Sequence, residues 1–179
     1  MKIVKKILIA LVIIIAIPLI VALFTNKDYA VEKEVIINKP RQEVFDYIKL
    51  LKNQDNYSVW ATMDPDMEKS YKGIDGTVGF ISAWNSKNKE VGKGEQEIMK
   101  ITDGERLDFQ LRFEIPFEAT DNAYMTTDSI SENQTKVKWG FTGKMDYPMN
   151  FMLLFMDMED MIGKDLENGL SNLKKVLEN

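Results

Sequence analysis

The stretch that decides the fold is YPMNFMLLFMDMEDMIGKDLENGLSNLK, residues 147–174. Apolar side chains recur over residues 150–177 at intervals of three, four or seven, the spacing of one face of an α-helix. We therefore expect one long helix over 150–177, and its apolar stripe must cover a large surface. The stripe comprises Phe151, Phe155, Met158, Ile162, Leu166, Leu173 and Leu177.

Upstream of this helix, strand candidates are separated by turn signals. The clearest is RLDFQLRFEI at residues 106–115, where apolar and polar side chains alternate, as in a strand with one buried face. Gly140 and Gly143 suggest bends or a bulge in the last strand. The other strands are expected at residues 30–38, 70–73, 77–86, 90–101, 123–130 and 135–145.

These elements predict an α+β fold in which a curved antiparallel sheet grips the last helix. A further helix is expected to open at Pro40, because proline is well tolerated in the first turn of a helix.

Five stretches resemble one known superfamily: KPRQEVFDYI, VWATMDPDM, GIDGTVG, GKGEQEI and the C-terminal run quoted above. Over residues 30–179 the chain resembles the SRPBCC superfamily, the START-like helix-grip group, and in particular its bacterial polyketide-cyclase-like branch. The resemblance implies six or seven antiparallel strands around the final helix, enclosing a cavity for lipids, sterols, polyketides or other apolar molecules. The matching motifs look structural, and no catalytic set of that superfamily is matched, so no activity is carried over.

The N-terminus carries a candidate membrane anchor. Residues 7–24, ILIALVIIIAIPLIVALF, contain no charged or polar side chain, and as a helix they would extend about 27 Å. That nearly matches the roughly 30 Å hydrocarbon core of a bilayer. The expected organisation is a basic flank at 1–6, a transmembrane helix at 7–24, a tether at 25–29 and the helix-grip domain at 30–179.

A cleaved signal peptide is the alternative interpretation of this segment. The apolar run is longer than the usual h-region of about 7–15 residues, and TNKDYA offers no convincing small-x-small cleavage site, so an uncleaved anchor is favoured. Lys2, Lys5 and Lys6 precede the span, which places the N-terminus in the cytoplasm and the domain on the outer face of the membrane.

Composition excludes several classes of function. The chain has no His and no Cys, which removes zinc and iron–sulfur ligation by these side chains, cysteine nucleophiles and Ser-His-Asp triads. The first 27 residues hold four lysines and no acid, so the remainder has 19 basic and 28 acidic residues, a net charge of −9. We expect no nucleic-acid partner, no metal and no cofactor.

Aromatic and methionine side chains are the main functional signal. Six of the eleven methionines fall within residues 145–161, and flexible thioethers adapt to irregular ligands, although they also fill cores. The expected ligand-binding wall consists of Phe109, Leu111, Phe113, Trp139, Phe141, Phe155 and Met158, with Trp84 and Tyr124 as further wall or rim groups.

Carboxylates are the only credible acid–base groups. Asp157, Glu159, Asp160 and Asp165 cluster on the last helix, where a solvated acidic face is the simpler interpretation. Asp64 and Asp66, on either side of Pro65, favour a turn over a metal site. Arg112 is expected on the outer face of its strand, in an ion pair; the alternative is an anchor for a ligand carboxylate inside a bent sheet.

Three functions are compatible with these features. The first is a membrane-anchored, non-catalytic binding module for a hydrophobic small molecule or lipid. The second is a cyclase- or hydrolase-type enzyme that uses cavity carboxylates or hydroxyls, which buried acids with a raised pKa would favour. The third is an envelope interaction protein with a solidly filled interior and an exposed apolar patch.

Overall fold

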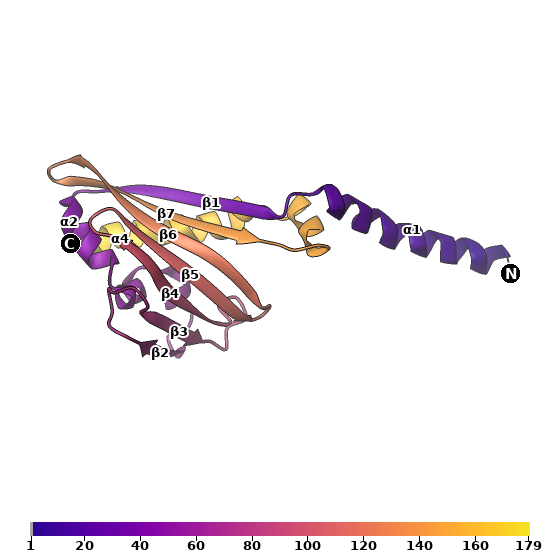
Figure 1. Cartoon of the computed structure of the whole chain (residues 1–179), viewed down its shortest axis with the longest axis horizontal. Coiled ribbons are helices and arrows are strands. Elements are labelled where there is room, and N and C mark those ends of the chain that lie inside the picture. Colours follow the sequence, from indigo (N-terminus) through magenta and orange to yellow (C-terminus); the bar gives the residue numbers. More distant parts are fainter. Residues whose placement is uncertain (1) are drawn as a thin grey trace.

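The domain is built on one curved sheet of seven antiparallel strands in the order β1-β7-β6-β5-β4-β3-β2 (Figure 1). The computed structural model describes residues 2–179. The strands are β1 (Asp28–Ile37), β2 (Glu68–Lys72), β3 (Ile81–Asn85), β4 (Lys93–Thr102), β5 (Arg106–Ile115), β6 (Ala119–Ser131) and β7 (Gln134–Lys144). The seven-stranded sheet confirms the expected fold class.

Helical segments cover the concave face of the sheet. Between β1 and β2 the chain forms α2 (Arg41–Ile48), the 3₁₀ helix η1 (Leu51–Asn56) and the short α3 (Val59–Thr62). The C-terminal helix α4 (Lys164–Glu178) follows β7 and lies along the sheet (Figure 1). Its apolar face is buried through Leu166, Leu170 and Leu173.

The core forms where the inner faces of the strands meet α2 and α4. Alternation in β5 places Leu107 and Phe109 on the inner face, with at most 1% of their surfaces exposed. The same inner face continues across the sheet, because Phe109 pairs with Ala123 of β6, and Ala123 pairs with Phe141 of β7. The inward side chains of 106–115 are therefore those predicted by period-two alternation.

The C-terminal helix is shorter than the expected 150–177. Residues Met149–Leu154 form a separate 3₁₀ helix, η2, the chain is irregular at 155–157, and a π turn, η3 (Glu159–Gly163), leads into α4. Asp157 Oδ1 accepts a hydrogen bond from the Asp160 N–H at 3.0 Å and so caps a new helical start. The expectation of one continuous helix is thus wrong in its first third.

Of the bends or bulge expected at Gly140 and Gly143, the bulge is wrong. Strand β7 stays in register with both β1 and β6 through these positions. A Cβ at Gly140 would collide with the ring of Tyr124, and one at Gly143 with the ring of Tyr29. The two glycines therefore leave room for tyrosine rings from the neighbouring strands.

The apolar N-terminal helix α1 (Lys2–Phe24) projects from one end of the domain (Figure 1). It is long and apolar enough to cross a membrane, a property that signal sequences share, and most of its side chains are exposed. Strand β1 begins at Asp28, so only Thr25, Asn26 and Lys27 separate helix from strand, fewer than the expected 25–29.

Asn150 fixes the end of α1 to the domain. Its side chain is fully buried, and Nδ2 donates to the Ala22 carbonyl at 2.7 Å and to the Thr25 carbonyl at 2.9 Å. These carbonyls belong to the last turn of α1 and its exit, where no intrahelical donor remains. The helix end is thereby held against η2.

We predict that Asn150→Ala loosens this junction. The two carbonyls lose their donor inside a buried contact, which costs about 1–3 kcal/mol. Hydrogen exchange followed by mass spectrometry should show faster exchange of the amides at residues 22–28, whereas Asn133→Ala in the exposed β6–β7 turn should leave them unchanged. Identical exchange in the two variants would contradict this role of Asn150.

Candidate functional site

A cavity of about 240 Å³ lies between the concave face of the sheet and the segments η1, α3 and η3. Its lining is mostly apolar and comes from ten helices and strands and three loops, so no short motif encodes it. The apolar lining residues are Leu51, Trp60, Ala61, Met67, Ala83, Trp84, Val91, Leu111, Phe113, Ala123, Trp139, Phe141, Ile162 and Leu166.

Aromatic rings form two opposite parts of the wall. Trp139 of β7 meets Tyr57 and Trp60 edge-on, with ring centroids 5.7 and 6.2 Å away. Across the cavity, Trp84 of β3 meets Phe113 of β5 edge-on at 5.9 Å. These rings offer flat surfaces for another planar or apolar group.

A loop and a glycine hold the Trp84 ring in place. Its Nε1–H donates to the Val91 carbonyl at 3.3 Å. A Cβ on Gly94, the neighbour across the β3–β4 pair, would lie 2.8 Å from the Trp84 ring. The indole can therefore lie across β4 only because position 94 has no side chain.

A few polar groups interrupt the apolar lining, chiefly Gln54, Ser58, Ser82 and Gln96. Gln54 Nε2 is buried and has no hydrogen-bond partner among the residues that the structure describes. The Tyr57 hydroxyl is its polar neighbour: burial raises the pKa of Tyr57, and the Gln54 side chain lowers it as a hydrogen-bonding neighbour. An acceptor in the cavity would improve the incomplete hydrogen bonding of this amide. One oxygen on an otherwise apolar ligand would satisfy it.

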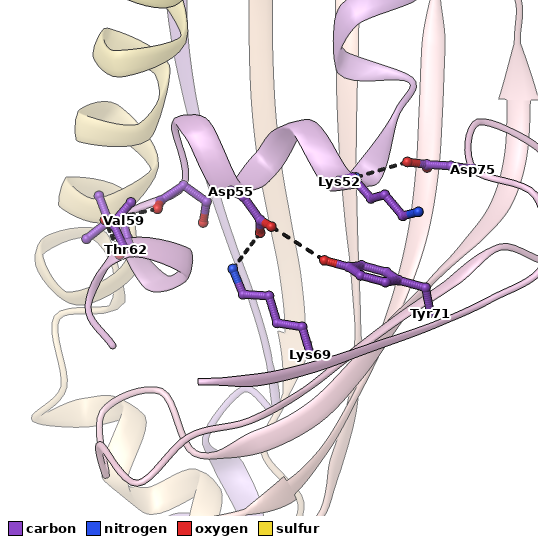
Figure 2. A network of polar contacts seen from close by, with 8 residues as sticks. Lys52, Asp55, Val59, Thr62, Lys69, Tyr71 and Asp75 are labelled. Carbon is purple, nitrogen blue, oxygen red and sulfur yellow. Dashed lines mark hydrogen bonds and ion pairs between the residues drawn. The ribbon is translucent and has the colours of Figure 1, made fainter. Parts of the chain in front are cut away.

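An ion pair borders the cavity between η1 and the edge strand β2. Figure 2 shows Asp55 contacting Lys69 at 2.8 Å and accepting a hydrogen bond from the Tyr71 hydroxyl at 3.4 Å. Both Asp55 and Lys69 line the cavity. Since β2 is exposed along its whole length, these contacts hold the edge strand against η1.

The start of η1 is fixed by a second carboxylate. Asp75 accepts hydrogen bonds from the backbone N–H groups of Leu51 and Lys52, at 2.8 and 3.2 Å, in the manner of a helix N-cap (Figure 2). The Lys52 ammonium lies 4.7 Å from the centre of the Tyr71 ring. The wall formed by η1 is thus tied to β2 and to the loop before β3.

The structure brings five of the nine predicted wall residues together in the cavity: Trp84, Leu111, Phe113, Trp139 and Phe141. Phe109 is core, with 1% of its surface exposed, and Met158 packs on the core from outside the cavity lining. That any of these residues contacts a ligand stays a prediction.

Tyr124 and Phe155 lie away from the cavity, which corrects their predicted position. Tyr124 shares the outer face with Asp108, its partner in β5, donates to Glu32 and lies under the Arg106 guanidinium. Phe155 follows the 3₁₀ helix η2 and is 75% exposed.

Sequence reasoning missed the cavity groups Leu51, Gln54 and Ser58. They come from η1 and the turn after it, where short 3₁₀ segments show no apolar periodicity. The segment containing Trp60 could be identified as aromatic, but its contact with Trp139 depends on tertiary packing.

The acidic clusters behave as surface or turn groups. Glu159 pairs with Lys33 at 2.5 Å, and Arg112 lies on the outer face in ion pairs with Glu95 and Glu97. Asp64 accepts hydrogen bonds from the Ser86 hydroxyl and the Asp66 N–H, which lowers the pKa of its carboxyl. Among residues 2–179 no group of three or more His, Cys, Asp or Glu side chains could hold a metal ion.

Two carboxyls depart from this behaviour. Burial, with the charge of Glu90 as a second cause, raises the pKa of Asp165. Asp121 lies on the inner face of β6 and is only 6% exposed. Burial raises its pKa above the usual value, opposed by the hydrogen bond from the Lys144 N–H to Oδ1 at 3.3 Å. Burial, with the nearby Asp121 carboxyl as a second cause, raises the pKa of Tyr29 to about 12. Neither group lines the 240 Å³ cavity.

Comparison with known proteins identifies the fold. Truncated norcoclaurine synthase from Thalictrum flavum superposes with a TM-score of 0.65 at 7% identity, covering 86% of this chain and 95% of that chain. The same enzyme in complex with dopamine and hydroxybenzaldehyde gives 0.61 at 8%, covering 89% and 91%. The Aha1 dimer from Colwellia psychrerythraea gives 0.57 at 12%, covering 84% and 96%.

At these identities the likeness shows the fold alone, and the chain has the START-like helix-grip fold. No family model and no curated protein matches the chain.

We predict that Asp121→Asn stabilises the domain at neutral pH. Between the ordinary pKa of about 3.8 and the raised pKa of the folded state, the folded protein holds a proton on Asp121 that the unfolded chain has lost. The free energy of unfolding therefore falls as the pH rises through this range. Asparagine keeps the acceptor for Lys144 without the charge.

Thermal unfolding at pH 7 should therefore give a higher Tm for Asp121→Asn than for the parent, with the difference vanishing near pH 3.5. Asp128→Asn, at an exposed position on the same strand, is the control and should show no such gain. A lower Tm at pH 7 for Asp121→Asn would refute the expected cost of burying this charge.

Proposed function

We propose that the domain binds one small, largely apolar molecule in the cavity, and that α1 anchors it to a membrane. The observation that carries the proposal is the aromatic cavity itself, which is apolar on most sides and has the Gln54 amide on one. Apolar pockets with a few directed polar groups are the usual form of small-molecule sites. The resemblance to the polyketide-cyclase-like branch of START-like proteins supports the same ligand class.

The cavity volume limits the size of the ligand. At about 240 Å³ it lies just below the roughly 300–1,000 Å³ of pockets that hold drug-sized ligands. That favours one ring or the end of an acyl chain over a whole two-chain lipid. Norcoclaurine synthase, which shares the fold, has been solved with dopamine and hydroxybenzaldehyde, both single-ring molecules.

An acid–base enzyme is the second candidate. Asp55 and Glu90 line the cavity, but Asp55 is held by Lys69 at 2.8 Å, and the buried Asp121 lies outside the lining. Glu90 forms no ion pair among the described residues, and its charge is the second cause, after burial, of the raised pKa of Asp165. Neither Glu90 nor Asp165 contacts a hydroxyl or a lysine in residues 2–179 through a hydrogen bond or an ion pair, so binding without turnover is the function better supported.

The binding test uses intrinsic fluorescence. All three tryptophans of the chain, Trp60, Trp84 and Trp139, line the cavity. We predict that 4-bromobenzyl alcohol, a single-ring probe whose bromine quenches tryptophan on contact, causes saturable quenching of the full chain in lipid nanodiscs.

Ala61→Phe places a ring in the cavity from α3. It should raise the Kd of 4-bromobenzyl alcohol at least tenfold, which corresponds to about 1.4 kcal/mol of binding free energy. Thr62→Phe, on the exposed side of the same helix, should bind like the parent. Linear, non-saturating quenching that is equal in both variants would eliminate the cavity as a binding site.

If α1 is a membrane anchor, the charges around it predict on which side of the membrane the domain lies. Lysines precede α1 and the domain follows it, so we expect the C-terminus on the outer side of the membrane. Alkaline phosphatase fused after Asn179 should be active in a bacterial host, and the fusion should stay in the membrane after carbonate extraction. An inactive phosphatase beside an active cytoplasmic reporter would reverse the topology, and release by carbonate would indicate cleavage of α1.

A further inference from the structure

A second hollow lies at the junction of α1, the start of β1 and η2. It is an open groove of about 840 Å³ that is separate from the 240 Å³ cavity. Apolar side chains from the last turn of α1 and from the segment after β7 line it, including Val21, Phe24, Leu154, Phe155 and Met156.

The groove sits at the level where α1 would leave the hydrocarbon core of a bilayer. Phe24 is 86% exposed, Phe155 75% and Leu154 54%, which makes one continuous apolar surface at the base of the helix. Exposed apolar patches of this kind indicate a binding partner. Because the patch is continuous with the candidate membrane helix, the partner that fits is bilayer lipid.

The groove has fixed walls. Asn150 ties the carbonyls of Ala22 and Thr25 to η2, so α1 and η2 are held together on either side of the hollow. The shape of the groove is therefore set by the fold, and an acyl chain that enters it would contact surfaces that are already formed.

Two pairs of residues, each with one member in either lining, connect the groove with the inner cavity. Tyr29 lines the groove and stacks on Phe141, a cavity residue, with ring centroids 6.2 Å apart and planes at 21°. Met158 lines the groove and Ile162, one turn later, lines the cavity. We take these two pairs as the barriers that a ligand passing between the hollows would meet.

The barrier on the helix side is built from deformable parts. Met158 is an unbranched, flexible side chain, and it stands between the irregular residues 155–157 and the π turn η3. Rotation of the Met158 side chain would join the two hollows without disturbing α4.

The charges around the groove select the headgroup. The carboxyl side chains that line it are Asp28 and Asp157, and no lysine or arginine is among its described lining residues. A headgroup with a net negative charge would be repelled there, whereas an uncharged, zwitterionic or amine-bearing headgroup would not.

We propose that the groove takes up an acyl chain of a bilayer lipid with an uncharged, zwitterionic or amine-bearing headgroup, and passes its end between Tyr29 and Met158 into the cavity. This rests on the proposed function, since it names the ligand class and the route of entry for the same cavity. The small cavity then holds the terminal part of the chain, while the rest lies in the groove.

The test measures tryptophan fluorescence of the full chain in nanodiscs of phosphatidylcholine that carries bromine near the end of one acyl chain. In an undisturbed bilayer these bromines lie near its midplane, out of contact with the three cavity tryptophans. Fluorescence should fall by about a third or more relative to unbrominated nanodiscs if the chain end reaches the cavity.

Phe155→Asp places a charge in the groove and should abolish most of this quenching. Ile130→Asp, at a 48% exposed position on the distant β6–β7 hairpin, is the matched control and should quench like the parent. Brominated phosphatidylglycerol should quench less than brominated phosphatidylcholine. Asp28→Asn combined with Asp157→Asn should remove that difference, because both carboxylate charges are lost. Asparagine at position 157 can still cap the Asp160 N–H, so the local fold is kept.

The outcomes separate the two proposals. If 4-bromobenzyl alcohol quenches saturably and brominated lipid does not, the cavity binds ligand but is loaded from water, and the lipid route is overturned alone. If neither probe quenches, the binding function fails as well. Equal quenching in Phe155→Asp and Ile130→Asp would overturn the groove as the route of entry.

Discussion

The contact between α4 and Trp139 sets the separation of the helix from the sheet, and the other features of the domain follow from it. A Cβ on Gly169 would lie 2.9 Å from the indole of Trp139, so the helix backbone rests almost directly on the ring. Leu166, Leu170 and Leu173 then close the core on either side of this point. The indole remains available on its cavity side, where Tyr57 and Trp60 pack edge-on.

The cavity and the groove both arise from one interruption in the C-terminal helical segment. Where α4 is continuous, its leucines fill the space above the sheet, and no hollow is left. Upstream, the π turn and the irregular residues 155–157 replace a continuous helix, and the cavity lies beside them, closed by the short segments η1, α3 and η3. Segment η2, which would have continued the helix, turns instead to the end of α1, where Asn150 supplies the donors that the helix carbonyls lack.

Polar contacts close the cavity on the side that hydrophobic packing leaves open. Strand β2 is fully exposed and contributes little to the core, so apart from its backbone pairing with β3, its contact with η1 depends on Asp55, Lys69 and Tyr71. Exposed ion pairs of this type contribute only about 0–1 kcal/mol each. This edge is therefore the part of the cavity wall that opens at the lowest cost, while the opposite wall is built into the sheet and its core.

The sequence by itself determined the elements whose side chains obey a period. Alternation in β5 assigned Leu111 and Phe113 to the inner face and Arg112 to the outer one, and the uninterrupted apolar run identified α1. It did not place Tyr124, because an amphipathic tyrosine fits either face and only the register with Asp108 puts it outside. Only the tertiary structure decided the break before α4 and the cavity groups of η1. The new helical start has a local cap, Asp157 on the Asp160 N–H, but the docking of η2 depends on Asn150, which caps carbonyls 128 and 125 residues away. The cavity depends on where helix and sheet fail to meet. Apolar periodicity predicts neither that docking nor the cavity, since both are set by contacts between segments distant in the chain.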